Sequence, residues 1–233
     1  MNTLIIFKKE IRTYFNSAIA YVVVVLFLVI SGYFFSTPIF IINQATIRHL
    51  IDLFPLLFLF FIPAITMRLF SEEQKTGTIE ILMTLPLKEY EIILGKYLSS
   101  VFLVSLCVLM TLFYSILLSF FGKIDIGQTI ASYFGVIMLG ATFCAIGIFS
   151  SSITKNQIIS FIVSFVICFT LFILGKMKIF IPSAFISLVD FVGIDSHFEN
   201  SVRGLIDTRD IIYYLSLIFL FLYVTFCVLK SKK

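Results

Sequence analysis

The polar segment from Arg68 to Lys96 holds the residues of this chain best suited to contact another molecule. Five of the 13 acidic residues lie in it: Glu72, Glu73, Glu80, Glu89 and Glu91. Long apolar runs flank the segment on both sides. Carboxylates interleaved with threonines and lysines, with no histidine among them, suit docking to a polar partner better than nucleophilic or acid–base catalysis.

Patterns typical of catalysis, nucleotide binding or metal binding are missing from the sequence. There is no Gly-x-x-x-x-Gly-Lys-Ser/Thr loop and no Gly-x-Gly-x-x-Gly loop after a strand. The only histidines are His49 and His197, and neither lies near a serine elbow. Asp190, Asp195, His197 and Glu199 cluster late in the chain, but their spacing matches no zinc pattern. We therefore expect no catalytic, cofactor-binding or metal-binding residues.

The composition is that of an integral membrane protein. The chain of 233 residues is 60% hydrophobic and 13% charged, with a mean hydropathy of +1.11. Soluble domains are about 45–50% apolar and about 25% charged. The net charge of +4 gives no indication of nucleic-acid binding. All four cysteines lie inside apolar runs, which is typical of thiols that pack as small hydrophobic groups.

The elements that position the polar segment are membrane-spanning helices, and we predict an all-α fold. Six apolar stretches are long enough to span a bilayer, which takes about 20 residues: 18–37, 53–69, 97–121, 129–151, 158–175 and 211–229. Residues 3–15 alternate apolar and basic positions, which predicts an amphipathic helix at the membrane surface. Residues 176–210 are interrupted by Pro182 and Gly193, so we expect short re-entrant or interfacial helices there, on the outer side.

The fourth predicted span is the only one rich in small residues. Gly140, Ala141, Ala145 and Gly147 lie within eight positions of one another. Small residues at four-residue intervals allow membrane helices to approach closely. We therefore predict that this face packs against other helices.

The distribution of basic residues predicts which side of the membrane each loop occupies. Eleven lysines and arginines fall on the side of the N-terminus and six on the other side. Because cytoplasmic loops carry the excess of basic residues, both termini are predicted to be cytoplasmic. The segment from Arg68 to Lys96 would then also face the cytoplasm.

Capping signals predict a short helix at the start of the polar segment. Ser71 followed by Gln74 three residues later fits a capping box. Glu72 and Glu73 would then lie in the first turn, where carboxylates interact favourably with the helix dipole.

A second short helix is predicted after Thr76-Gly77-Thr78, which breaks the first one, and Pro86 would end it. The two helices would meet at a right-angle bend along the membrane surface. The alternative is a solvated loop between spans. We favour the helices because a loop needs neither caps nor thirty residues.

Several of these stretches resemble the permease subunits of ABC-2-type transporters. The resemblance is strongest around Glu72-Glu73 and Thr76-Gly77-Thr78 and continues in the same order along nearly the whole chain. The similar stretches are residues 64–82, 85–87, 93–97, 151–157 and 197–214. Within this group, the sequence is most similar to the gliding-motility-associated permeases of Bacteroidota.

The resemblance implies one permease domain over residues 1–233 that is driven by a separate ABC ATPase. Residues 3–15 would be the elbow helix and 71–84 the coupling region. The coupling residues would be Ser71, Glu72, Glu73, Thr76, Gly77, Thr78 and Glu80. The ATPase would bind ATP and magnesium, so this chain would hold no cofactor.

Such permeases lie in the bacterial inner membrane and pair with a second copy or a related membrane subunit. Export is the expected direction of transport. Two other functions stay open on the sequence: a membrane anchor that transmits force from an ATPase without transporting, and a membrane-embedded enzyme. The enzyme would need a polar catalytic cluster at membrane depth, which the sequence does not provide.

Overall fold

The structure is a computed structural model that describes residues 2–42, 47–84, 87–120, 125–177 and 191–231. The described residues form helices and short connections, with no strand among them. In chain order the helices are α1 (Asn2–Asn16), α2 (Ala18–Ile42), α3 (Arg48–Thr66), α4 (Arg68–Thr76), α5 (Thr78–Thr84), α6 (Glu89–Met110), α7 (Leu112–Ser119), α8 (Ile126–Ile153), α9 (Gln157–Lys176), α11 (Ile194–Val202) and α12 (Thr208–Ser231). The all-α prediction is confirmed.

Among the described residues, six stretches of helix are long and apolar enough to cross a membrane, which confirms the predicted number of spans. They are Ala20–Thr37 within α2, Arg48–Thr76 from α3 and α4, Glu89–Ser119 from α6 and α7, and helices α8, α9 and α12. The protein is therefore a multi-pass membrane protein.

The second and third spans begin earlier than the apolar runs indicate. The second begins at Arg48 instead of 53, and the third at Glu89 instead of 97. In the third, the Glu91 carboxylate accepts a hydrogen bond from the Lys88 backbone N–H at 3.0 Å and caps the helix. A polar first turn can therefore be helical although it adds nothing to the hydropathy that located the span.

Helix α8 is the central helix of the bundle, and α3, α6, α9, α11 and α12 pack around it. Gly140, Ala145 and Gly147 are completely or nearly completely enclosed. A methyl group at Gly140 would lie 3.0 Å from Val104 of α6, and one at Gly147 would collide with Thr66 of α3. The small residues thus lie where neighbouring helices come closest.

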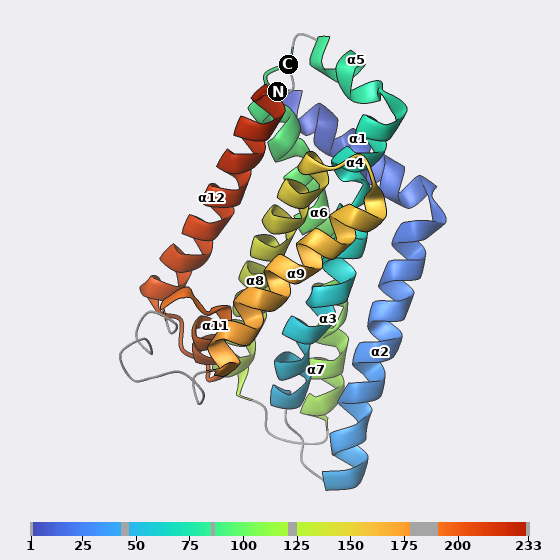
Figure 1. Ribbon diagram of the computed structural model, residues 1–233. Helices are drawn as coiled ribbons and strands as arrows, with labels where there is room; N and C mark the ends of the chain where they lie inside the picture. The colour runs from blue at the N-terminus through green and yellow to red at the C-terminus, as the bar shows by residue number, and fades with distance from the viewer. Residues whose placement is uncertain (1, 43–46, 85–86, 121–124, 178–190, 232–233) are drawn as a thin grey trace.

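The two ends of the bundle differ. The start of α1 and the end of α12 lie at the same end as α4 and α5, whereas α11 lies at the opposite end (Figure 1). Helix α11 packs against α8 and α9 and is the short helix expected between the last two spans. Its predicted companion falls on 178–190, outside the described residues.

Candidate coupling site

Helix α4 continues α3 instead of starting a separate surface helix. Only Met67 lies between them, and its φ of −52° and ψ of −31° are helical. The Met67 N–H donates to the Pro63 carbonyl at 2.9 Å, as in an uninterrupted helix. The first of the two short helices expected along the membrane surface is therefore the end of the second span.

The capping box predicted at Ser71 is wrong. Ser71 is fully buried inside α4, and its hydroxyl donates to the Met67 carbonyl. The Gln74 side-chain amide donates to the Ser152 carbonyl at the end of α8, at 2.7 Å. Gln74 therefore joins α4 to α8, whereas Ser71 bonds within its own helix.

The predicted break after α4 is confirmed at Gly77. This residue has a φ of +73°, the left-handed conformation that glycine adopts at helix C-termini at low cost. The Thr76 hydroxyl donates to the Glu72 carbonyl at 2.9 Å and also lies 2.9 Å from the Thr78 hydroxyl. The chain then resumes as α5 at the end of the bundle (Figure 1), where Ile79 and Leu82 pack against the core.

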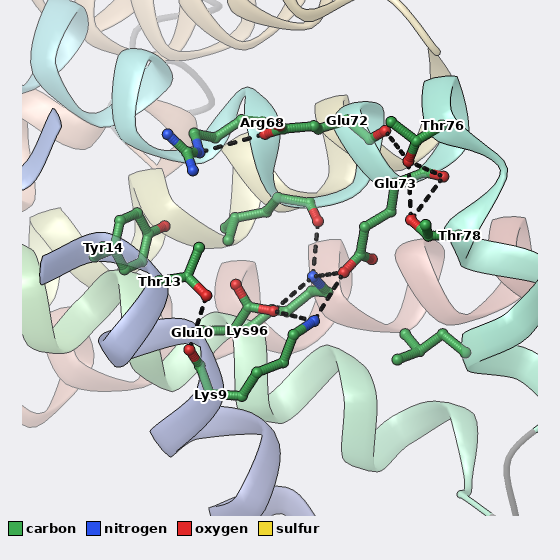
Figure 2. A pocket seen from close by; sticks show the side chains of 12 residues that line it. Lys9, Glu10, Thr13, Tyr14, Arg68, Glu72, Glu73, Thr76, Thr78 and Lys96 are labelled. Atoms are coloured by element: carbon green, nitrogen blue, oxygen red, sulfur yellow. Dashed lines mark hydrogen bonds and ion pairs between the residues drawn. The ribbon is translucent and has the colours of Figure 1, made fainter. Parts of the chain in front are cut away.

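A buried lysine joins α4 to two other helices below this break. Lys96 of α6 has only 1% of its surface exposed. Its ammonium group lies 3.0 Å from Glu10 Oε1 of α1 and 2.8 Å from Glu73 Oε1 of α4, and it donates to the Leu69 carbonyl at 2.8 Å (Figure 2). The donor of all three hydrogen bonds is a charged ammonium group, and such bonds are stronger than those between neutral groups.

Lys9 of α1 completes this group of charges. Its ammonium group lies 3.3 Å from the same oxygen atoms of Glu10 and Glu73. We call Lys9, Glu10, Glu73 and Lys96 the ion-pair cluster. With two positive and two negative groups, its formal charge is zero, which lowers the cost of burying it.

Electrostatic interactions keep Glu10 and Lys9 ionised. Burial by itself would raise the pKa of Glu10, but the nearby Lys96 and Lys9 outweigh burial and lower it below its ordinary value. Burial would likewise lower the pKa of Lys9, yet Glu10 and Glu73 raise it. Both groups are therefore charged at neutral pH.

A cavity of about 400 Å³ opens beside the cluster, between α1, α4, α5 and α6. Figure 2 shows the residues that line it. Arg68 and Glu72 form an ion pair at 3.5 Å on one wall. The second carboxylate oxygen of Glu73 is buried and has no hydrogen-bond partner among the described residues. The cavity therefore offers polar groups of both signs next to the exposed surface of α4.

The predicted coupling residues divide into two groups by exposure. Glu72, Thr76, Gly77, Thr78 and Glu80 are exposed around the α4–α5 break. Ser71 is buried, and the Glu73 side chain, 16% exposed, is engaged in the ion-pair cluster. A partner could contact the first group directly, whereas the other two residues act inside the bundle.

Lys9, Glu10 and Lys96 were not predicted as site residues: the two lysines contributed only to the predicted topology, and Glu10 lies outside the polar segment from Arg68 to Lys96. A signal was present for Lys96. It lies three and four residues after Ile93 and Ile92, and three and four before Ser99 and Ser100, all of them buried. A charge in register with a buried helical face points to a buried ion pair.

The acidic residues at the opposite end have individual partners. Asp195 pairs with Lys176 at 3.0 Å, and Glu199 pairs with Arg203 at 2.6 Å. His197 Nδ1 lies 2.6 Å from Asp210. In the described part of the chain, no three such residues gather as metal ligands, and Asp190 lies outside it.

Comparison with known proteins identifies the family. The model of the ABC-2 family transporter protein matches residues 4–218. No curated protein matches the chain. A family model that covers nearly the whole length agrees with the six spans, and the family implies an ABC ATPase as partner. The chain therefore belongs to the ABC-2 family of transporter proteins, as a membrane subunit.

Proposed function

We propose that this chain is the permease subunit of an ABC transporter and that a separate ATPase drives it through the exposed surface around the α4–α5 break. ATP and magnesium would be bound by that ATPase. The observation that carries the proposal is the ion-pair cluster, which joins this exposed surface to α1 and α6.

The cluster gives a physical route for force. A displacement of α4 that left α1 and α6 in place would separate Glu73 from Lys96 and leave a buried charge unpaired. Loss of one partner of a buried ion pair costs about 3–5 kcal/mol. Moving the three helices together avoids that cost. Pressure on α4 and α5 would therefore shift the elbow helix and the third span as one body.

The same proposal includes orientation and assembly. The surface around the α4–α5 break, the start of α1 and the end of α12 lie at one end of the bundle, and the excess of basic residues falls on that side. This supports cytoplasmic termini in a bacterial inner membrane. Pairing with a second copy or a related subunit, export, and a link to gliding motility stay predictions from the sequence resemblance.

The test separates contact with the ATPase from insertion. Glu80 at the α4–α5 break and Glu199 of α11 are both exposed glutamates on short helices at opposite ends of the bundle. The tagged full chain is purified from its native membranes, and the ATPase recovered with it is quantified by mass spectrometry. Glu80→Lys, and more strongly Glu72→Lys with Glu80→Lys, should reduce this recovery, whereas Glu199→Lys should not.

If the Glu72→Lys and Glu80→Lys double variant recovers as much ATPase as the unaltered chain, the surface around the α4–α5 break is not the contact. ATP-dependent movement of a substrate in vesicles that contain chain and ATPase would identify a permease. Its absence, with ATPase binding intact, would identify a membrane anchor.

A further inference from the structure

An apolar groove of about 570 Å³ lies between α1 and α6. Leu4 and Phe7 line it from α1, and Leu98, Val101 and Phe102 line it from α6. The rings of Phe7 and Phe102 meet edge to face, with their centroids 5.9 Å apart. The lining is almost entirely carbon, so the groove suits a hydrocarbon chain and not a polar solute.

The groove lies beside a close contact between its two helices. Gly95 of α6 has no side chain, and a methyl group there would lie 2.7 Å from Ile6 of α1. Ile6 is accordingly buried against α6. Next to this contact, Leu4 and Leu98 remain 69% and 46% exposed. The two helices thus pack closely at Ile6 and Gly95, and the apolar groove lies next to this contact.

A row of cations begins at the end of this groove. Leu4, Lys8 and Arg12 follow one another at four-residue intervals, so they form a stripe along one side of α1. Lys8 and Arg12 are exposed, and neither forms an ion pair with any described residue. Lys9, by contrast, is engaged in the ion-pair cluster. Four residues of helix rise by about 6 Å, so the first free ammonium group is close to the groove.

We propose that the groove binds one acyl chain of an anionic phospholipid, whose headgroup phosphate is held by Lys8 and Arg12. The apolar groove suits the acyl chain of such a lipid, and the two cations, unpaired among the described residues, suit its phosphate. A neutral or zwitterionic lipid could occupy the groove but would gain less from the cations. The proposal rests on the membrane location of the chain and not on coupling to an ATPase.

The chain contains no tryptophan, so a single introduced indole reports on one position. Phe102→Trp places it in the groove. Phe169→Trp on α9 is the matched control, because Phe169 is 40% exposed and Phe102 is 42% exposed, and α9 packs mainly against α8, α3 and α11. Leu98→Trp is a second groove reporter in case Phe102→Trp does not fold.

The full chain carrying one reporter is reconstituted in vesicles of phosphatidylcholine that contain either brominated phosphatidylglycerol or brominated phosphatidylcholine. Bromine on an acyl chain quenches an indole in contact with it. In Phe102→Trp, the relative binding constant should favour phosphatidylglycerol about fivefold or more, since a cation near an anionic membrane surface contributes about 1 kcal/mol. In Phe169→Trp the two lipids should quench equally.

Adding Lys8→Gln and Arg12→Gln to Phe102→Trp should abolish the preference without reducing quenching by phosphatidylcholine. Equal quenching by the two lipids in both groove reporters would overturn the proposal and leave only ordinary lipid contact. A preference that survives both glutamine substitutions would overturn the assignment of the headgroup to this stripe of cations.

Discussion

Replacing Lys96 with methionine removes the central cation of the ion-pair cluster while keeping a long, flexible side chain. Three interactions of the ammonium group are lost: those with Glu10 at 3.0 Å, with Glu73 at 2.8 Å and with the Leu69 carbonyl at 2.8 Å. Two largely buried carboxylates then keep only Lys9, whose side chain is 53% exposed.

The size of the effect follows from this remaining partner. Removal of one member of a buried ion pair costs about 3–5 kcal/mol, chiefly because the other charge stays buried without compensation. Lys9 stays 3.3 Å from both carboxylates and offsets part of that penalty. We therefore expect Lys96→Met to lower the free energy of unfolding by about 3 kcal/mol, roughly a hundredfold in the equilibrium constant.

The assay is unfolding of the purified chain in mixed detergent micelles, followed by circular dichroism and tyrosine fluorescence. Lys155→Met is the control, because Lys155 is exposed in the turn between α8 and α9, and it should change stability by less than about 0.5 kcal/mol. Adding Glu10→Gln to Lys96→Met should recover part of the loss, since it removes one of the stranded charges.

A Lys96→Met variant within about 1 kcal/mol of the wild type would refute this reasoning, because that is the value of an exposed ion pair. A double variant less stable than Lys96→Met would refute the assignment of the penalty to Glu10.

Three further predictions follow from other parts of the structure. Gly147→Ala should destabilise the bundle by about 1–3 kcal/mol, because the new methyl group collides with Thr66; thermal unfolding that is unchanged would contradict this close contact of α3 and α8. Gly77→Ala should cost about 1 kcal/mol, because alanine is strained at a φ of +73°, and an unaltered midpoint in the same assay would contradict it. The pKa of Glu10 in the fold is below its ordinary value of 4.5. Ionised Glu10 therefore stabilises the fold above pH 4.5, and this stabilisation is lost as the pH falls through the pKa of the folded state. Wild type and Glu10→Gln should therefore converge in stability in acid, and a constant difference down to pH 2 would oppose this.

The spans and the break at Gly77 could be predicted because each depends on residues close together in the sequence. Apolar runs of sufficient length locate spans whatever their neighbours are. A glycine between two threonines ends a helix by its own backbone conformation. The outer ends of α8 and α9 were located to within three residues for the same reason.

The role of Ser71 could not be predicted from its neighbours in the sequence. A serine three residues before a glutamine fits a capping box, but whether it caps depends on what precedes it. Here α3 continues through Met67, so Ser71 lies inside a helix and its hydroxyl turns back to a carbonyl. The continuity of the helix through Met67 prevailed over the local capping signal.

The ion-pair cluster could not be predicted from the sequence for a different reason. Lys96 and Glu10 are 86 positions apart, and either one alone is an ordinary charge near the end of an apolar run. Their meeting depends on how α1 lies across α6, which is set by the Ile6–Gly95 contact. Sequence periodicity locates faces of helices but not which faces meet.

The order of the cluster along the chain has a consequence for biosynthesis. Glu10 and Glu73 both precede Lys96, so a chain made from its N-terminus has completed both carboxylates before this lysine emerges. The third span can therefore enter the bilayer with the Lys96 ammonium group already paired, provided that α1 and α4 have remained near the insertion site. A chain that lost its first helix would still contain six apolar runs, but Glu73 would then be the one carboxylate of the cluster left to pair with Lys96.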